Sequence, residues 1–198
     1  GSTALAAMLC TAAVTAAGDL RLIEAVRAKS IERVRALVAQ GVDVNGTQGD
    51  KATALHWAVH LDDMPTVDAL IRAGAQAGAA DDTGATPLYL ACLNRNAAMV
   101  TRLLEAGANP NAALLGGETV LMTCARTGEA AGVRALLDRG AAANARESAH
   151  GQTALMWAAA QSHPAAVEAL LARGADVHAR SRTYTQHATT DATPRARR

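Results

Sequence analysis

Large aromatic side chains are scarce in this sequence of 198 residues, which has no Phe, two Tyr and two Trp. Half of its residues are nonetheless hydrophobic, and Ala, Leu and Val supply most of them. A globular domain of this length usually fills a deep centre with aromatic side chains. The composition therefore argues against one deep core and favours a thin layer of helices that pack closely through small residues.

Neither sign of charge is in excess. Lys and Arg number 19 against 18 Asp and Glu, which gives a formal net charge of +1. Such a balance creates no overall field that would draw the protein to nucleic acid or to anionic lipid. Long hydrophobic runs are missing too, since no stretch approaches the ~20 apolar residues of a membrane-spanning helix. We therefore expect neither a nucleic-acid partner nor a membrane span.

The motifs of common enzymes are also missing. The sequence contains no G-x-S-x-G, no phosphate-binding loop and no G-x-G-x-x-G, and Ser is scarce. His56 and His60 stand four residues apart, a spacing that can place two imidazoles on one metal ion. No third ligand accompanies them, and the glutamate of an H-E-x-x-H motif is absent. The sequence thus predicts a protein that is not an enzyme and has no cofactor or metal site.

The most regular feature of the sequence is a period of about 33 residues. A threonine and a glycine recur at this interval, at Thr53, Thr86, Thr119 and Thr153 and at Gly41, Gly74, Gly107, Gly140 and Gly174. A period of this length is typical of stacked supersecondary units, each of which buries its apolar side only against its neighbours. It predicts an array of five units.

One unit, Asp81–Ala113, shows what each copy encodes. Thr86 is placed to cap a first helix with its hydroxyl, and Pro87 follows at the position where a missing N–H costs nothing. This helix is expected to run to about Leu93. After a short polar turn, apolar residues recur at the three-and-four spacing of a second helix, which Gly107 ends by tolerating a left-handed conformation. A hairpin loop then leads to the next copy.

The copies resemble ankyrin repeats, and in particular ankyrin arrays of bacterial type. The resemblance covers about Leu20 to Arg180 and rests on the helix starts T-A-L-H-W-A, T-P-L-Y-L-A, T-V-L-M-T-C and T-A-L-M-W-A, together with exits such as G-V-D-V-N and G-A-D-V-H. It implies an all-α solenoid of helix-turn-helix units with hairpin loops. It also implies a concave surface, made by hairpins and first helices, that binds a partner protein.

Three segments are expected along the chain. Residues 19–180 form the ankyrin repeat domain, with units at about 19–47, 48–80, 81–113, 114–146 and 147–180. Residues 1–18 are rich in Ala, and two interpretations of Ala4–Ala17 remain open. A signal-peptide remnant predicts a periplasmic or secreted protein, whereas a helix that caps the first unit predicts a cytoplasmic one. Residues 181–198 are polar and end in P-R-A-R-R, which predicts a disordered basic tail.

Several copies depart from the family pattern. The histidine of the family motif is kept only at His56, and Tyr89, Met122 and Met156 replace it, so we expect looser hairpins in those copies. One residue is inserted between Asn144 and Thr153, which predicts a bulged loop.

The cysteines are few and scattered. Cys10, Cys92 and Cys124 are too few for a disulfide framework or a thiolate zinc site. Cys92 and Cys124 occupy positions where other copies carry Ala or Val, so we expect small buried hydrophobes. With the helix axes of adjacent units ~10 Å apart, a bridge between them is not expected.

The last unit lacks a polar outer side. Its second helix, predicted at Pro164–Arg173, has the composition of an interior copy, whereas solenoids need polar ends. This favours one of two arrangements. Either the array is longer than five units, or the last unit is covered by the tail or by another subunit, and cover by another subunit would mean self-association.

The resemblance places partner contacts at variable hairpin positions and at the ends of the first helices. In this sequence the candidates are Asp50, His60, Leu61, Asp82, Thr83, Leu93, Asn94, Leu115, Glu118, Arg126, Thr127, His150, Gln152 and Gln161. The predicted function is a non-catalytic scaffold for protein–protein interaction with an unidentified partner. The alternatives are a recognition segment of a larger enzyme or multidomain protein, and a secreted effector directed at a host.

Overall fold

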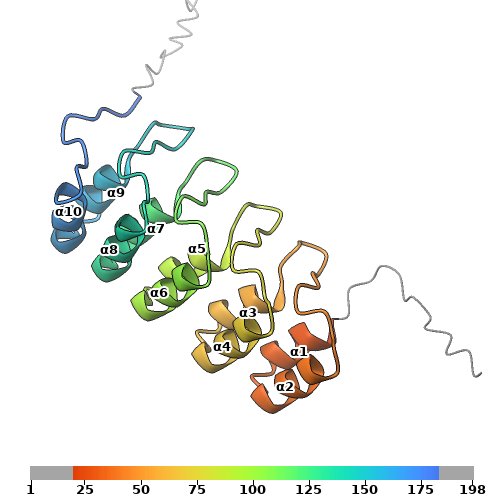
Figure 1. The fold of residues 1–198 in the computed structure, drawn as a ribbon. Helices are drawn as coiled ribbons and strands as arrows, with labels where there is room; N and C mark the ends of the chain where they lie inside the picture. Colours follow the sequence, from red (N-terminus) through yellow and green to blue (C-terminus); the bar gives the residue numbers. More distant parts are fainter. Residues whose placement is uncertain (1–19, 183–198) are drawn as a thin grey trace, which may run out of the picture.

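The computed structural model describes residues 20–182, which form a row of helix pairs (Figure 1). The predicted capping or signal segment and nearly all of the predicted tail lie outside the described residues. The helices of the described part are α1 (Arg21–Arg27), α2 (Ile31–Ala39), α3 (Ala54–His60), α4 (Met64–Arg72), α5 (Pro87–Leu93), α6 (Ala97–Glu105), α7 (Val120–Thr127), α8 (Ala130–Asp138), α9 (Ala154–Ala160) and α10 (Pro164–Leu171). Each odd-numbered helix and the next even-numbered one make up one unit.

The recurring threonines cap the first helices. The side chains of Thr53, Thr86, Thr119 and Thr153 each accept a hydrogen bond from the backbone N–H three residues later. These helices have only seven or eight residues, and isolated helices that short are not stable in water. Their stability therefore depends on caps and on packing against neighbouring units.

The helices form two layers. Odd-numbered helices pack against odd-numbered helices of adjacent units, as α7 does against α9, and even-numbered helices form the second layer, as α6 and α8 do. The connections between units, residues 40–53, 73–86, 106–119 and 139–153, project as hairpins from the side of the odd-numbered helices (Figure 1). The described part of the chain is thus an all-α repeat solenoid, as predicted.

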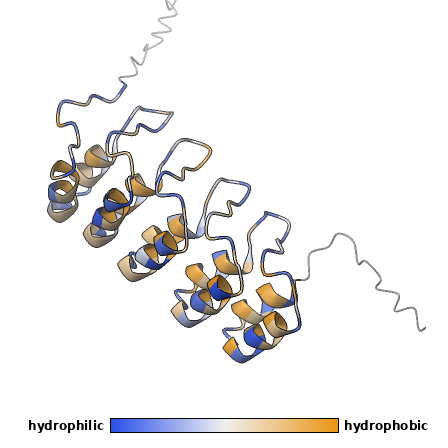
Figure 2. Ribbon diagram, viewed as in Figure 1, coloured by the Kyte–Doolittle hydropathy of each residue, from blue (hydrophilic) through white to orange (hydrophobic). Residues whose placement is uncertain are grey.

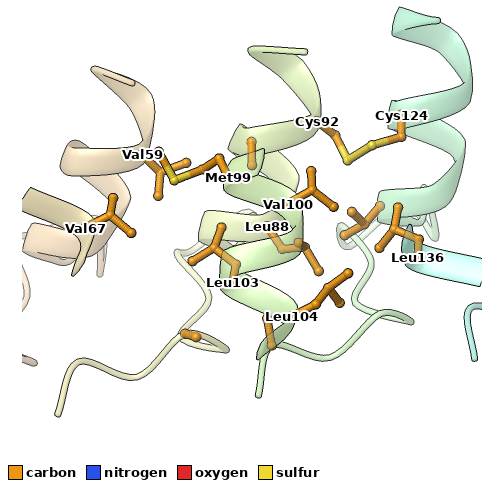
Figure 3. Packing of buried hydrophobic residues seen from close by; sticks show 14 of the residues in the cluster. Val59, Val67, Leu88, Cys92, Met99, Val100, Leu103, Leu104, Cys124 and Leu136 are labelled. Carbon is orange, nitrogen blue, oxygen red and sulfur yellow. A yellow bond between two sulfur atoms is a disulfide. The ribbon is translucent and has the colours of Figure 1, made fainter. Parts of the chain in front are cut away.

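Hydrophobic residues concentrate on the helices, while the hairpins are mostly hydrophilic (Figure 2). In the third unit Leu88, Met99, Val100 and Leu103 are fully buried and lie between the neighbouring units (Figure 3). The fifth residue after the capping position is small in every unit and fully buried, being Ala25, Ala58, Ala91, Cys124 and Ala158. These small side chains allow the first helices to approach closely, which explains a core built without Phe.

Cys92 and Cys124 form a disulfide between α5 and α7, so the expectation of two unbridged buried cysteines was wrong (Figure 3). Their Cα atoms are 4.7 Å apart, well within the range for a disulfide. The expectation used the separation of the helix axes. Each Cα lies ~2.3 Å from its own axis, so residues on facing sides of two helices ~10 Å apart come within bonding reach.

Neighbouring hairpins are joined by main-chain hydrogen bonds. Asp82 N donates to Asp50 O at 3.0 Å, and Leu115 N donates to Thr83 O at 3.1 Å. Ser148 N repeats the pattern by donating to Gly116 O at 3.0 Å. These bonds connect each hairpin to the next, and the loops lie side by side in Figure 1.

The extra residue in the fourth hairpin is accommodated around Glu147. This buried side chain accepts hydrogen bonds from the backbone N–H groups of Ala149, His150 and Gln152. These bonds hold the pKa of the Glu147 carboxyl below its ordinary value, the bond from Gln152 being the largest cause. The carboxylate therefore serves as the organising centre of the longer loop.

The two ends of the array differ in polarity. In α2 the charged residues Glu32, Arg33 and Arg35 are exposed. In the last unit Leu171 is 42% exposed and Val177 is 62% exposed. The apolar character predicted for the last unit is therefore present on its surface.

Candidate partner-binding face

The side of the solenoid that carries the hairpins and the odd-numbered helices, called the hairpin face below, holds the candidate residues. Half of them lie on the hairpins themselves: Asp50, Asp82, Thr83, Leu115, Glu118, His150 and Gln152. The others lie at or directly after the ends of odd-numbered helices: His60, Leu61, Leu93, Asn94, Arg126, Thr127 and Gln161. The fold thus brings residues from four units to one side of the molecule.

Some candidates have structural roles that the sequence pattern did not reveal. Asn94 Nδ2 donates to the carbonyl oxygen of Val59 at 2.7 Å, and Thr127 Oγ1 donates to that of Cys92 at 3.0 Å. Both bonds join the end of one first helix to the preceding one. Leu61 is half-buried against the hydrophobic core. These three residues therefore also help to hold the face together.

Arg126, Gln152 and Gln161 line one pocket on the hairpin face, together with Trp157 and Ala160. The guanidinium of Arg126 lies 5.6 Å from the ring centroid of Trp157. Trp157 Nε1 donates to Gln152 Oε1 at 2.8 Å. Hydrogen bonds and stacking therefore hold these side chains in place.

Glu118 anchors the same region from the third hairpin. Its Oε1 accepts from Thr123 Oγ1 at 2.9 Å and lies 3.3 Å from Arg126 Nη2. The Arg126 and Glu118 side chains are 40% and 21% exposed. An ion pair with this exposure contributes little stability, roughly 0–1 kcal/mol, but it orients Arg126 over the following unit.

A second pocket, of about 140 Å³, includes the candidates Asp50 and His60. Its remaining lining residues are Gln48, Ala52, His56, Trp57, Asp81 and Leu90. Asp50 accepts from the backbone N–H of Ala52 at 2.9 Å and from Gln48 Nε2 at 3.2 Å. The rings of Trp57 and His60 meet edge to face with centroids 5.8 Å apart.

Two ionisable groups that line this second pocket, His56 and Asp81, have shifted pKa values. Burial lowers the pKa of His56, which keeps the imidazole neutral. Burial opposes the ionisation of Asp81, but hydrogen bonds from Thr83 and from the backbone N–H of Ala85 outweigh it and hold the pKa of Asp81 below its ordinary value. The pocket therefore contains an acidic edge beside a neutral ring.

The hairpin face also exposes apolar side chains. Leu115 at a hairpin tip is 82% exposed, and Leu93 at the end of α5 is 39% exposed. On the same face, Asp82 pairs with Lys51 of the preceding hairpin at 2.8 Å. Thr83, His150 and Gln161 complete the candidates as exposed polar residues. The result is a mixed surface with two exposed leucines, one at the end of α5 and one in the hairpin that follows α6.

Sequence reasoning missed the parts of the two pockets that come from the framework. Trp57 and Trp157 both pack against the core, yet each also lines a pocket. Gln48 and Asp81 were not among the candidates. Their only sequence signal is proximity to Asp50 and Asp82 in the hairpins.

The described residues offer no evident metal site. Within residues 20–182 no group of three or more His, Cys, Asp or Glu side chains is arranged to hold a metal ion. Both ring nitrogens of His56 are already used, since Nδ1 accepts from Thr53 N and Nε2 lies 3.1 Å from Ala85 O. None of the described helices has the length and hydrophobicity needed to cross a bilayer.

Comparison with known proteins identifies the repeats. The sequence profile of a family described as ankyrin repeats (3 copies) matches residues 22–114 and, again, residues 112–181. The two matches together cover nearly all of the described solenoid. No curated protein matches the chain.

Proposed function

The chain belongs to the ankyrin repeat family, and we propose that it is a non-catalytic scaffold that binds a partner protein through its hairpin face. Ankyrin repeats are generally protein–protein interaction modules. The observations that support this face are the exposure of Leu115 and Leu93, at 82% and 39%, and two pockets on it that are each lined by a tryptophan. Removing these exposed leucines from water at a contact with a partner would favour association.

The proposal is tested by disrupting this face without disturbing the core. Leu93→Ser and Leu115→Ser together remove the exposed apolar side chains. A matched control, Thr101→Ser with Ala131→Ser, changes exposed positions on the opposite layer. Tagged wild-type protein and both variants are incubated with extract of the native organism, and captured proteins are identified by mass spectrometry.

We expect the control to capture the same specific partner as the wild type and the hairpin-face variant to lose at least tenfold of it. Circular dichroism should show equal helical content in all three proteins. Equal capture by the hairpin-face variant would rule out this face as the binding site.

A contact between two copies is proposed for the last unit. Leu171 and Val177 are exposed there, while the outer side of α2 at the other end is charged. A head-to-tail contact would pair these unlike surfaces, so a two-fold contact between two last units is favoured. This contact is tested by measuring the molar mass of the wild type and of Leu171→Lys by light scattering over a range of protein concentrations. A molar mass that does not change with concentration in either protein would refute the contact.

The disulfide supports one alternative for the place where the protein works. Cytosolic reductants keep thiols reduced, whereas the periplasm and the extracellular space allow disulfides to persist. The Cys92–Cys124 bond therefore favours the periplasmic or secreted alternative.

A further inference from the structure

One pocket on the hairpin face combines a positive charge with unused hydrogen-bond donors. This pocket, called the Arg126 pocket below, has a volume of about 260 Å³ and is lined by Arg126, Gln152, Trp157, Ala160 and Gln161. Ala160 and Gln161 are exposed, Gln152 and Trp157 are half-buried, and the side chain of Arg126 is 40% exposed. A ligand can therefore reach the lining side chains from solvent.

Arg126 is the only charged residue among those that line this pocket. Its guanidinium lies 5.6 Å from the ring centroid of Trp157. Nη2 donates to Glu118 Oε1 at 3.3 Å, and a further hydrogen bond joins Arg126 to Tyr89. A guanidinium carries more N–H donors than these two bonds use. Arg126 is thus held in place and still has donors for a ligand.

Gln152 offers donors beside Arg126. Its Oε1 accepts from Trp157 Nε1 at 2.8 Å. Because an indole N–H can only donate, this bond fixes which end of the amide faces the ring. No hydrogen bond within residues 20–182 uses the NH₂ group at the other end, and none uses the side chain of Gln161. Both amides therefore remain available to a ligand.

The hairpin that contains Gln152 adds positive charge to this region. Arg146 and Arg182 each donate to a main-chain carbonyl oxygen of that hairpin, at 3.0 Å and 3.1 Å. A carbonyl group has no net charge, so these bonds do not neutralise the arginines. The carboxylate of Glu147 in the same hairpin offsets one of them, but it is buried and accepts from backbone N–H groups. The balance of these three charges is positive.

The charge and the donors of the Arg126 pocket favour an anionic side chain. Ammonium and guanidinium groups would face the like charge of Arg126 and carry donors only. A neutral amide could accept hydrogen bonds through a single oxygen. A carboxylate has two oxygens that accept and no hydrogen to donate, and its hydrogen bonds to a guanidinium are about twice as strong as neutral ones.

The pocket beside Trp57 has the opposite character. Asp50 and Asp81 line it, so that it disfavours a carboxylate. Ala52 stands there in the place of Gln152, and Trp57 Nε1, which is buried, has no hydrogen-bond partner among the described residues. Trp57 therefore serves as an internal control for a ligand that the Arg126 pocket selects by charge.

We propose that the Arg126 pocket binds an acidic side chain of the partner protein, whose carboxylate accepts hydrogen bonds from Arg126 and from the NH₂ group of Gln152. This inference rests on the proposed scaffold function and adds the chemistry that one part of the hairpin face recognises. Since Gln152 is bonded to Trp157, the indole N–H of Trp157 reports on the occupied pocket.

The test follows the two indole N–H signals in a ¹⁵N–¹H correlation spectrum of the full chain, with Trp57→Phe to assign them. N-acetyl-glutamate methylamide is titrated at neutral pH, with N-acetyl-glutamine methylamide as the matched amide. We expect a saturable shift of the Trp157 signal with a Kd on the order of 1–10 mM, as befits a ligand of this size. The amide should bind at least about tenfold more weakly, and the Trp57 signal should stay in place.

A third probe separates a side chain from the end of a chain. N-acetyl-alanine carries only a terminal carboxylate and should bind no more tightly than the acidic probe. Tighter binding of N-acetyl-alanine would contradict the assignment to a side chain.

Matched variants separate pocket binding from general effects of charge. Gln152→Glu keeps an oxygen for Trp157 Nε1, but it replaces the NH₂ group and adds a negative charge beside Arg126, so the acidic probe should bind at least about tenfold more weakly. Arg126→Met should have the same effect. Gln40→Glu makes the same change of charge on an exposed side chain of the first unit and should leave the Trp157 response intact.

An unchanged Trp57 signal and equal helical circular dichroism show that each variant is folded. The proposal is overturned by an absent Trp157 response or by equal affinities for acid and amide. It is also overturned by a response that survives either Gln152→Glu or Arg126→Met.

The probe tests the pocket without any partner, so the two proposals can fail separately. A silent Trp157 signal in a protein that still captures its partner through Leu93 and Leu115 rejects the carboxylate site alone. A specific response in a protein whose capture does not depend on those leucines rejects the proposed binding face and leaves the pocket.

Discussion

At the scale of single residues, His56 shows how a side chain can be fixed in one protonation state by its neighbours. Its Nδ1 lies 3.1 Å from the backbone N of Thr53, which can only donate, so Nδ1 must accept. The proton therefore sits on Nε2, which donates to Ala85 O at 3.1 Å and braces the next hairpin. The two bonds connect the start of α3 to the following unit.

This arrangement predicts that acid destabilises the fold. Burial lowers the pKa of His56 in the folded state, so the unfolded chain takes up the proton first. The contribution of the neutral His56 ring to the free energy of unfolding is complete above the ordinary histidine pKa of about 6.5. It is lost as the pH falls below that value. Protonation would also set a second donor against Thr53 N. We therefore expect the urea concentration at the midpoint of unfolding to be lower at about pH 5.5 than at about pH 7.5.

The chain itself supplies the control for that prediction. Met122 stands at the position equivalent to His56, and its sulfur accepts from Thr119 N at 3.4 Å. His56→Met should therefore still form the start of the helix. Because the bond to Ala85 O is lost, its free energy of unfolding at neutral pH should be lower by about 1 kcal/mol. Its stability should decrease less than that of the wild type when the pH is lowered. An acid response of the same size in this variant would assign the effect to other groups.

At the scale of elements, asparagines tie the exits of successive units together. Asn45 Nδ2 donates to Gly74 O and its Oδ1 accepts from Gln76 N. Asn111 and Asn144 make the same pair of bonds to the units that follow them. The second unit carries Gly78 at this position, so its connection to the third unit has no such tie.

We predict that Gly78→Asn stabilises the protein. A Cβ at Gly78 meets no atom within 4 Å, and the backbone there is not left-handed. The new amide would reach Gly107 O and Asn109 N, the equivalents of the partners of Asn45. We expect a gain of about 1–2 kcal/mol from two exposed hydrogen bonds and from a less flexible unfolded chain, measured by urea denaturation.

The control is Gly78→Ala, which restricts the unfolded chain without adding hydrogen bonds. Gly78→Ala should raise the free energy of unfolding by only about 0.4–1 kcal/mol. Equal stabilisation by Ala and Asn would show that the asparagine ties do not contribute here.

The disulfide between α5 and α7 acts on the middle of the array. It joins residues 32 apart in sequence, and closing a loop of that length stabilises a protein by about 3–4 kcal/mol through the unfolded state. We predict that reductant lowers the stability of the wild type by this order and leaves Cys92→Ala/Cys124→Ala unaffected. Mass spectrometry after alkylation should find the two cysteines in one linked peptide pair, and free thiols at both would contradict the bond.

At the scale of the whole molecule, the sequence predicted the features that depend only on residues within one unit, namely where its helices begin and end. The capping threonines and the glycines at left-handed positions act within a few residues of their own helix, so the period alone placed the helices. The disulfide, the unsatisfied N–H of Trp57 and the supporting roles of Asn94 and Thr127 depend on contacts with the adjacent unit. Such contacts become visible only when the units are stacked in space.

The same locality gives the last prediction, which concerns the removal of one complete unit. Among the described helices, the main contacts lie within a unit or between adjacent units. Deleting residues 48–80 joins Thr47 to Asp81 and therefore brings α1 and α2 against α5 and α6 in the register that α3 and α4 now occupy. Nearest-neighbour stacking predicts a shorter protein that still unfolds cooperatively, with a denaturant m-value reduced by roughly a fifth.

Deleting residues 64–96, which have the same length, provides the control for this experiment. That deletion fuses the end of α3 to the start of α6 and therefore also preserves the 33-residue register, but it removes Cys92 and hence the disulfide. Both shortened proteins should show helical circular dichroism spectra, and the difference between their stabilities should vanish in reductant to within about 1 kcal/mol. Loss of the cooperative transition in both would show that the array depends on contacts beyond adjacent units.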